Sequence, residues 1–226
     1  MLRRATIIIV LLGIAAFSLH VVRNDFVMLD DRMLILENPF VQEWSLWSLR
    51  MVFATYDPEL YVPLTLLAYQ ILHAAFGNIA LPFHLVSLTL HLGSSLFVLA
   101  IAQRLSRSRE VALVVASLFA IHPLQTEAVL WASALKDVLS GFLFLAALLL
   151  YLRYREEGRR RWYGLSLALF FPALLSKVSV LMFPVVLLLI HWKERSPLLE
   201  RRTWTDLLPF FALSMLFGIV ALFGKA

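Results

Sequence analysis

The chain has 226 residues, of which 61% are hydrophobic and 15% are charged, and it contains no cysteine. Its mean hydropathy of +0.83 excludes a soluble globular protein, because such a chain cannot cover itself with a water-compatible surface. Without cysteine, disulfide bridges, thiolate metal ligands and a cysteine nucleophile are excluded too. The formal net charge of +5 does not indicate nucleic-acid binding, because the basic residues flank apolar segments instead of forming an aromatic-interleaved patch.

The first apolar segment, residues 5–22, directly follows Arg3 and Arg4. A basic start before an apolar run is typical of a signal peptide, but no convincing small-residue cleavage site follows this one. We therefore expect the segment to remain in the protein as a first membrane span.

A long stretch rich in Trp, Leu and Tyr separates this segment from the next apolar run. Residues 44–53 and 63–76 carry apolar side chains at helical spacing, and Pro63 suits a first helical turn. We expect these helices to lie in the plane of the membrane interface. A second transmembrane hairpin is the alternative, but residues 63–76 would extend only about 21 Å as a helix, against roughly 30 Å of hydrocarbon.

Six further apolar segments lie at residues 83–102, 111–121, 138–152, 163–175, 179–190 and 207–223. The chain is therefore predicted to be all-α, a transmembrane helical bundle of about seven spans that forms a single domain over residues 1–226. Seven crossings place 14 Lys and Arg residues on the side of the N-terminus and five on the other, which predicts a cytoplasmic N-terminus. Nine acidic residues fall on the outer side and six on the cytoplasmic side, so we expect the chemistry outside.

An acidic pair, Asp30 and Asp31, follows the first segment in an apolar setting. Two adjacent carboxylates repel each other, so the pKa of one is expected to rise toward that of a useful general base. A solvated turn with a helix cap explains the pair about equally well, and both interpretations stay open.

Residues 122–137 hold a second group of polar side chains, where the third span is expected to return outward. This group contains His122, Glu127, Lys136 and Asp137. Charged side chains at the entrance of an apolar helix need a partner or a cavity. Lys136 and Asp137 therefore indicate either a binding site or simple pairing with each other and capping of the next helix.

Lys177 is flanked by apolar runs and is expected at the outer tip of a tight hairpin. A lone cation there suits a phosphate group, and a lysine that extends its amine to the interface is the alternative. His84 and His91 lie seven residues apart on one face of a span and favour interhelical hydrogen bonds, because no third metal ligand is spaced to join them. The sequence neither requires nor excludes a divalent metal.

These motifs follow one another in an order that resembles a known family. The motifs are Phe26-Val-Met-Leu-Asp30-Asp31, Glu37-Asn-Pro39, Val62-Pro63-Leu64-Thr65, Phe76-Gly77, Phe83-His84, His91, Leu118-Phe-Ala-Ile-His122-Pro123, Glu127-Ala-Val-Leu-Trp131, Lys136-Asp137-Val-Leu-Ser140 and Leu175-Ser-Lys177. From Asp25 to about Trp192, the chain is similar to the transmembrane part of the tetratricopeptide-repeat O-mannosyltransferases and their bacterial relatives, within the GT-C superfamily.

The resemblance implies an enzyme that transfers a sugar such as mannose from a polyprenyl-phosphate carrier to a hydroxyl of an acceptor protein or glycan, on the non-cytoplasmic face. A bacterial inner membrane is the implied location. By the resemblance, Asp30 would be the general base, Asp31 would tune or replace it, and Glu127 would lie across the site. Lys177, with Lys136 or His122, would neutralise the departing phosphate, and Asp137 would belong to the same binding site.

Two departures from the family limit what the resemblance implies. No 34-residue repeat follows the seventh span, so the chain is interpreted as a truncated N-terminal half of a GT-C-like module whose activity alone stays open. Val178 stands where repeat-bearing relatives often have Glu. A transporter is one alternative, although the spans are nearly free of the charges that mark a transport route, and a non-catalytic membrane scaffold is another.

Overall fold

The computed structural model describes residues 2–56, 60–194 and 201–223. These residues form helices joined by short turns, and no strand occurs among them, so the predicted all-α fold class is confirmed.

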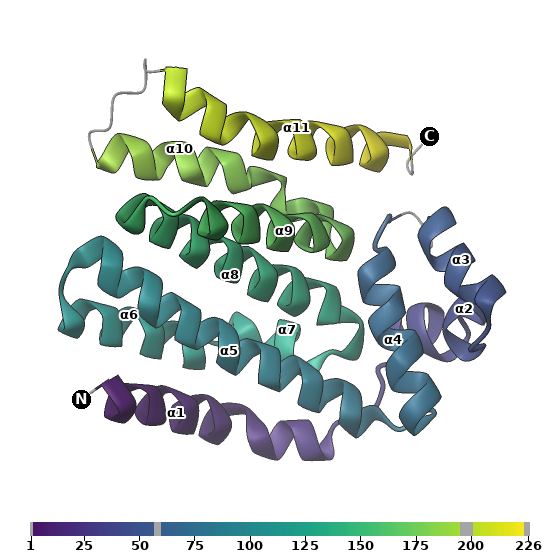
Figure 1. The fold of residues 1–226 in the computed structure, drawn as a ribbon. Coiled ribbons are helices and arrows are strands. Elements are labelled where there is room, and N and C mark those ends of the chain that lie inside the picture. Colours follow the sequence, from purple (N-terminus) through teal and green to yellow (C-terminus); the bar gives the residue numbers. More distant parts are fainter. Residues whose placement is uncertain (1, 57–59, 195–200, 224–226) are drawn as a thin grey trace.

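Long helices run side by side and build most of the molecule (Figure 1). In chain order they are α1 (Leu2–Arg23), α5 (Ala80–Ser106), α6 (Arg109–Ile121), α8 (Leu135–Glu157), α9 (Arg160–Ser176), α10 (Phe183–Lys193) and α11 (Arg201–Phe223). Each apolar segment predicted from the sequence coincides with one of these helices. The segment 179–190 also includes the short 3-10 helix η3 (Val178–Met182), which precedes α10. In the described part of the chain, three stretches are long and apolar enough to cross a membrane: Ala80–Ser106, Ala132–Glu157 and Thr203–Phe223.

The helices begin and end where local sequence dictates. The Ser108 hydroxyl caps α6 by accepting a hydrogen bond from the backbone N–H of Val111, at 3.2 Å. Gly158 ends α8 in the left-handed region with φ +69°, a conformation that costs glycine little. Pro123 prevents α6 from continuing beyond Ile121, because proline disfavours a helical conformation of the residue before it. As a result α6 is only 13 residues long, about 20 Å.

The segment between α1 and α5 folds into short helices at one end of the bundle (Figure 1). They are the π-helix η1 (Arg32–Leu36), α2 (Pro39–Gln42), α3 (Leu46–Ala54) and α4 (Pro63–Phe76). The helices predicted for residues 44–53 and 63–76 are thus present as α3 and α4, with Pro63 in the first turn of α4. Ile35, Val52 and Tyr69 are almost completely buried between these helices and Phe83 of α5, which fixes the segment to the bundle.

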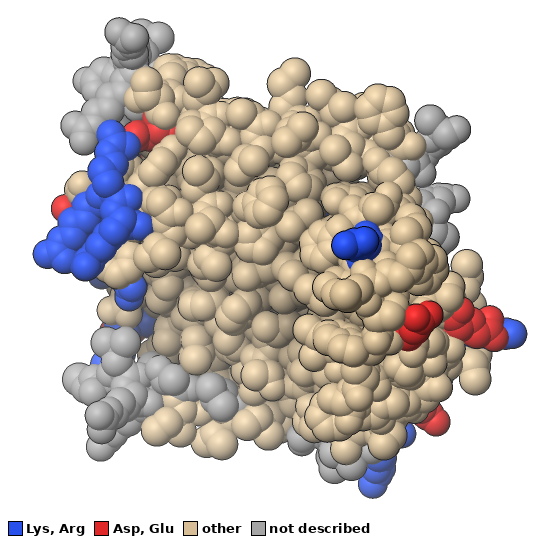
Figure 2. Space-filling model, turned by 45° about the vertical axis from the view of Figure 1, so that its right-hand side comes forward, with Lys and Arg blue, Asp and Glu red and all other residues tan. Residues whose placement is uncertain are grey.

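Charged side chains are unevenly distributed along the bundle. In Figure 2 the largest group of Lys and Arg side chains lies at one edge of the molecule, and most visible Asp and Glu side chains lie toward the opposite edge. The end with Arg107 and Arg159, in the α5–α6 and α8–α9 turns, is called the basic end below. The end with Asp30 and Asp31 is called the acidic end.

Candidate functional site

Asp31 connects the acidic segment after α1 to the turn that precedes α8. Its side chain is fully buried. One carboxylate oxygen accepts the backbone N–H of Ser133 at 2.7 Å, and the other accepts the N–H of Val27 at 2.8 Å. Two segments 102 positions apart therefore meet at this carboxylate. The helix-cap interpretation is wrong for Asp31, because the side chain makes no capping bond to η1.

Asp30, the other member of the acidic pair, has different surroundings. Its side chain is half-buried, and its carboxylate makes no hydrogen bond or ion pair within the described residues.

The buried hydroxyl of Tyr69, on α4, donates to the carbonyls of Ala132 and Ser133. Burial raises the pKa of this hydroxyl well above its usual range, and the charges of Asp31, Asp137 and Asp30 raise it further. Three carboxylates therefore lie within electrostatic reach of one phenol.

Lys177 forms an ion pair with Asp137, which corrects two sequence interpretations. Lys177 is not a lone cation, and Asp137 does not pair with its neighbour Lys136. The reason is the antiparallel packing of α8 and α9, which brings the residue after the last turn of α9 against the first turn of α8. Both side chains remain partly exposed, at 27% for Lys177 and 40% for Asp137.

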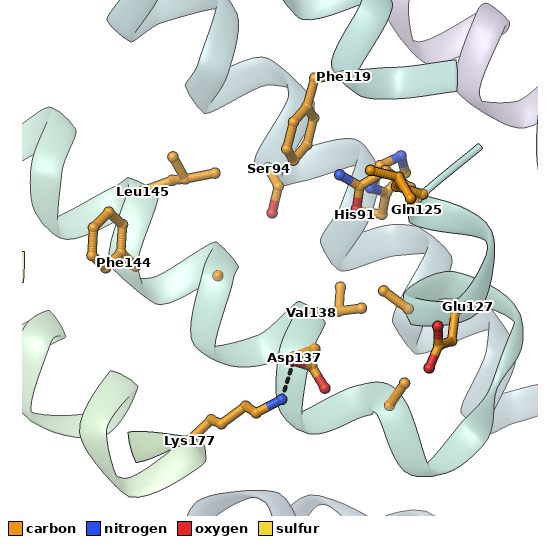
Figure 3. A pocket seen from close by; sticks show the side chains of 14 residues that line it. His91, Ser94, Phe119, Gln125, Glu127, Asp137, Val138, Phe144, Leu145 and Lys177 are labelled. Atoms are coloured by element: carbon orange, nitrogen blue, oxygen red, sulfur yellow. Dashed lines mark hydrogen bonds and ion pairs between the residues drawn. The ribbon is translucent and has the colours of Figure 1, made fainter. Parts of the chain in front are cut away.

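A cavity of about 590 Å³ opens beside this ion pair. Glu127, Asp137 and Lys177 lie together at one side of it, with Ser94 and Phe119 at the other (Figure 3). The remaining lining residues are His91, Leu124, Gln125, Ala128, Ala134, Val138, Gly141, Phe144 and Leu145. The cavity thus combines three charged side chains with apolar and aromatic walls, and its size is typical of a small-molecule site.

The cavity lies beside the early end of α6. Because α6 stops at Ile121, the chain turns into the short helix α7 (Gln125–Leu130), and the bundle volume beyond α6 stays unfilled by a long helix. On the facing helix α8, Gly141 leaves open space where a side chain would project. His91 is held in the cavity wall by a 3.0 Å hydrogen bond between its Nε2 and the carbonyl of Ala120.

The structure brings only some of the predicted site residues together. Glu127, Asp137 and Lys177 line the cavity, whereas Asp30, Asp31, Lys136 and His122 are not among its lining residues. Asp31 still lies close by, because its partner Ser133 precedes the lining residue Ala134. Glu127 and Lys136 make no side-chain contact with a polar partner within the described residues, and His122 accepts the N–H of Leu124 at 3.2 Å.

Several buried polar atoms near this region have no hydrogen-bond partner among the described residues. They include both ring nitrogens of His84, the hydroxyls of Ser87 and Ser133, and the indole N–H of Trp131. The interhelical bonding predicted for His91 and His84 is therefore confirmed only for His91. Composition and spacing gave no signal for Ser133 or Tyr69, because their roles arise from contacts between distant segments. No group of three His, Cys, Asp or Glu side chains that could hold a metal occurs in the part of the chain described.

Known proteins similar to this chain are protein O-mannosyl-transferases. The chain is 34% identical to Tmtc1 of Drosophila melanogaster over 122 residues, which are 53% of this chain. It is 32% identical to TMTC1 of Mus musculus over 147 residues, which are 60% of this chain. It is 31% identical to Tmtc2 of Drosophila melanogaster over 157 residues, 64% of its length. The matched parts are 14%, 15% and 17% of these relatives, so the chain spans less than a fifth of their length.

These similarities confirm the resemblance to the O-mannosyltransferases that the motifs indicate. Together with the long apolar helices they identify a membrane protein. The relatives named are animal proteins and give no support to a bacterial inner membrane. The chain matches no protein-family model, and no solved structure matches it.

Proposed function

We propose that this chain is the membrane-embedded part of a glycosyltransferase that transfers a sugar, mannose by analogy with the relatives, from a polyprenyl-phosphate carrier to an acceptor hydroxyl. The observation that carries the proposal is the meeting of distant polar residues at the acidic end. Asp31 is bonded to Ser133, Lys177 to Asp137, and Glu127 faces the same cavity as that ion pair. Group transfer needs its base, its phosphate-binding cation and its substrate-orienting groups close together around one site.

Asp30 suits the role of general base better than Asp31. Both oxygens of Asp31 are occupied by backbone N–H groups in a buried place, whereas the carboxylate of Asp30 is free to accept a proton. In the proposed step, Asp30 takes the proton of the acceptor hydroxyl as its oxygen bonds to the sugar's anomeric carbon. The bond from that carbon to the carrier phosphate breaks, and the phosphate leaves with the electron pair.

The cavity suits the carrier's phosphate and the first part of its lipid chain. Lys177 is the positively charged lining residue, and a bound phosphate would share its ammonium with Asp137, while Phe119, Phe144 and Leu145 supply an apolar wall. A fixed cation in a water-poor site stabilises the negative charge that develops on a departing phosphate. Lys136 and His122, outside the cavity lining, are proposed to assist only if the carrier extends beyond it. Glu127 would orient the sugar hydroxyls.

The same proposal gives the short helices at the acidic end a place in the membrane interface. Trp44, in the α2–α3 turn, is 63% exposed, and Leu46 and Trp47, in the first turn of α3, are 77% and 54% exposed. Aromatic and apolar side chains exposed side by side suit the boundary between headgroups and hydrocarbon. We propose seven crossings, with these helices in plane on the non-cytoplasmic side.

Replacing Asp30 with Asn tests the proposal. Asn keeps the side-chain volume but cannot act as a base, so transfer from a polyprenyl-phosphate sugar should fall by about 10² to 10⁴ while carrier binding stays unchanged. Transfer is measured with the purified chain in lipid nanodiscs and a hydroxyl-bearing acceptor peptide. Glu37→Gln is the matched control, because Glu37 is exposed in the same segment and, among the described residues, forms its ion pair with Arg32.

The outcomes separate the candidate functions. Undiminished transfer by Asp30→Asn would remove Asp30 from the role of base. Carrier binding without any transfer by the native chain would instead indicate a carrier-binding scaffold.

A further inference from the structure

At the basic end, two arginines contact one tryptophan ring: Arg153 lies near the C-terminal end of α8, and Arg161 and Trp162 lie in the first turn of α9. The guanidinium carbon of Arg161 lies 4.4 Å from the ring centroid of Trp162, and that of Arg153 lies 5.4 Å from the same ring. The indole N–H of Trp162 donates to Glu157 at 2.8 Å, which fixes the ring against the end of α8. Both guanidinium groups are therefore within cation–π distance of the same ring, and their charges lie within about 10 Å of each other.

These two arginines differ from their neighbours in forming no ion pair with a carboxylate in the described part of the chain. Arg104, Arg155, Arg159 and Arg160 pair with Glu156, Glu194, Glu157 and Asp206, respectively. Within the described residues, Arg153 and Arg161 make no ion pair. Glu157 accepts the indole N–H, but its ion pair is with Arg159, so an anion that contacts both Arg153 and Arg161 would be stabilised by their charges. Guanidinium groups present paired N–H donors that match phosphate oxygens.

We propose that Arg153, Arg161 and Trp162 form a binding site for the phosphate of an anionic phospholipid headgroup. The site lies where the apolar stretch Ala132–Glu157 ends, which is the depth of headgroups when that stretch crosses a bilayer. Tryptophan beside arginine is typical of a membrane interface, and the aliphatic part of Arg153 can follow the apolar surface of α8. The site is at the end opposite the cavity and is independent of the proposed transfer reaction.

A membrane lipid fits this turn better than a soluble anion does. Each arginine near a lipid surface contributes about 1 kcal/mol to the attraction of anionic lipid, which corresponds to about fivefold in affinity. Headgroups in a leaflet are present at high local concentration, so two weak contacts suffice for occupancy. The interaction is electrostatic and is therefore expected to weaken with added salt.

The test measures dissociation constants of the 226-residue chain for short-chain phosphatidylglycerol by native mass spectrometry from a neutral detergent. Arg161→Gln should weaken binding about fivefold, and the Arg153→Gln/Arg161→Gln double variant by about 10- to 30-fold. The matched control is Arg159→Gln, in the same turn, exposed and paired with Glu157. Arg159→Gln should change binding less than about twofold if Arg153 and Arg161 form the site.

Parallel arms decide the outcome. Phosphatidylcholine of the same chain length should bind equally to all variants, and a native thermal midpoint for Arg161→Gln shows that the fold is retained. The proposal fails if the double variant binds phosphatidylglycerol as the native chain does, or if Arg159→Gln loses as much. It also fails if inorganic phosphate displaces the lipid at equal concentration, because the site would then serve a soluble anion.

Discussion

Asp30 and Asp31 are neighbours in the sequence, but the fold gives their carboxylates different surroundings. Asp31 is buried and accepts two backbone N–H groups, while Asp30 keeps its oxygens free. A carboxylate that accepts several N–H bonds in a buried place stabilises the structure that supplies them. This division lets one aspartate hold the segment while the other stays available for chemistry.

We expect Asp31→Asn to destabilise the protein. The amide group of Asn would turn one N–H donor toward another, either at Val27 or at Ser133, and leave a buried donor unsatisfied. Such a defect costs about 1 to 3 kcal/mol. Thermal unfolding in detergent should show a lowered midpoint for Asp31→Asn. The midpoint of Asp30→Asn should be almost unchanged. Equal midpoints for the two variants would contradict the anchoring role of Asp31.

The Asp137–Lys177 ion pair raises the question of whether Lys177 serves the carrier or only the fold. If Lys177 binds phosphate, Lys177→Met should weaken carrier binding about tenfold or more, because a charge-assisted bond is lost. Asp137→Asn should keep or strengthen binding, since it frees the ammonium. A purely structural pair would instead make both variants lose thermal stability equally and bind the carrier alike. Isothermal titration with a short-chain polyprenyl phosphate distinguishes these results.

At the scale of residues, sequence reasoning found the charged positions but not their partners. The apolar surroundings of Asp30, Asp31, Asp137 and Lys177 made them recognisable as exceptional. Which of them meet depends on the pairing of helices that are 40 to 102 positions apart, as in the bonds of Lys177 and Asp31. A single sequence carries no signal for such contacts.

The helices themselves were predictable, because long apolar runs bounded by charge or by glycine and proline leave few alternatives. Residues 83–102 and 138–152 fall inside α5 and α8. The helix ends extend beyond these ranges by several residues, since backbone hydrogen bonds continue into polar flanks such as Arg153 to Glu157. The cavity was not predictable, as it needs the short α6, the turn into α7 and the open position at Gly141 at once.

Filling the cavity from α8 tests whether it binds the carrier. A side chain at Gly141 would enter open space, so Gly141→Leu should preserve the fold while occupying part of the cavity. We expect carrier binding to weaken about tenfold or more, because buried ligand contacts are replaced by the new side chain. Gly164→Leu is the control, since Gly164 in α9 also has open space around it but does not line the cavity. Equal binding by both variants would place the carrier elsewhere.

At the scale of the whole molecule, the separation of charge suits a protein with a different task at each end. The acidic end carries Asp30, Asp31 and the short helices beside exposed Trp44 and Trp47, and the basic end carries Arg153 and Arg161 on the Trp162 ring. Basic residues are retained on the cytoplasmic side during membrane insertion, which is the physical reason for expecting the basic end there. The proposed transfer would then occur on the opposite, non-cytoplasmic side.

Labelling of single cysteines tests this orientation, and the natural absence of cysteine makes the experiment free of background. Met28→Cys lies at the acidic end, where Met28 is 74% exposed, and should react with a membrane-impermeant maleimide in intact cells. Arg159→Cys, exposed in the α8–α9 turn, should react only after the membrane is permeabilised. Because both side chains are accessible in the fold, a difference between them reports the membrane barrier and not burial. Labelling of Arg159→Cys in intact cells, with Met28→Cys protected, would reverse the orientation and place the cavity's charged side on the cytoplasmic face.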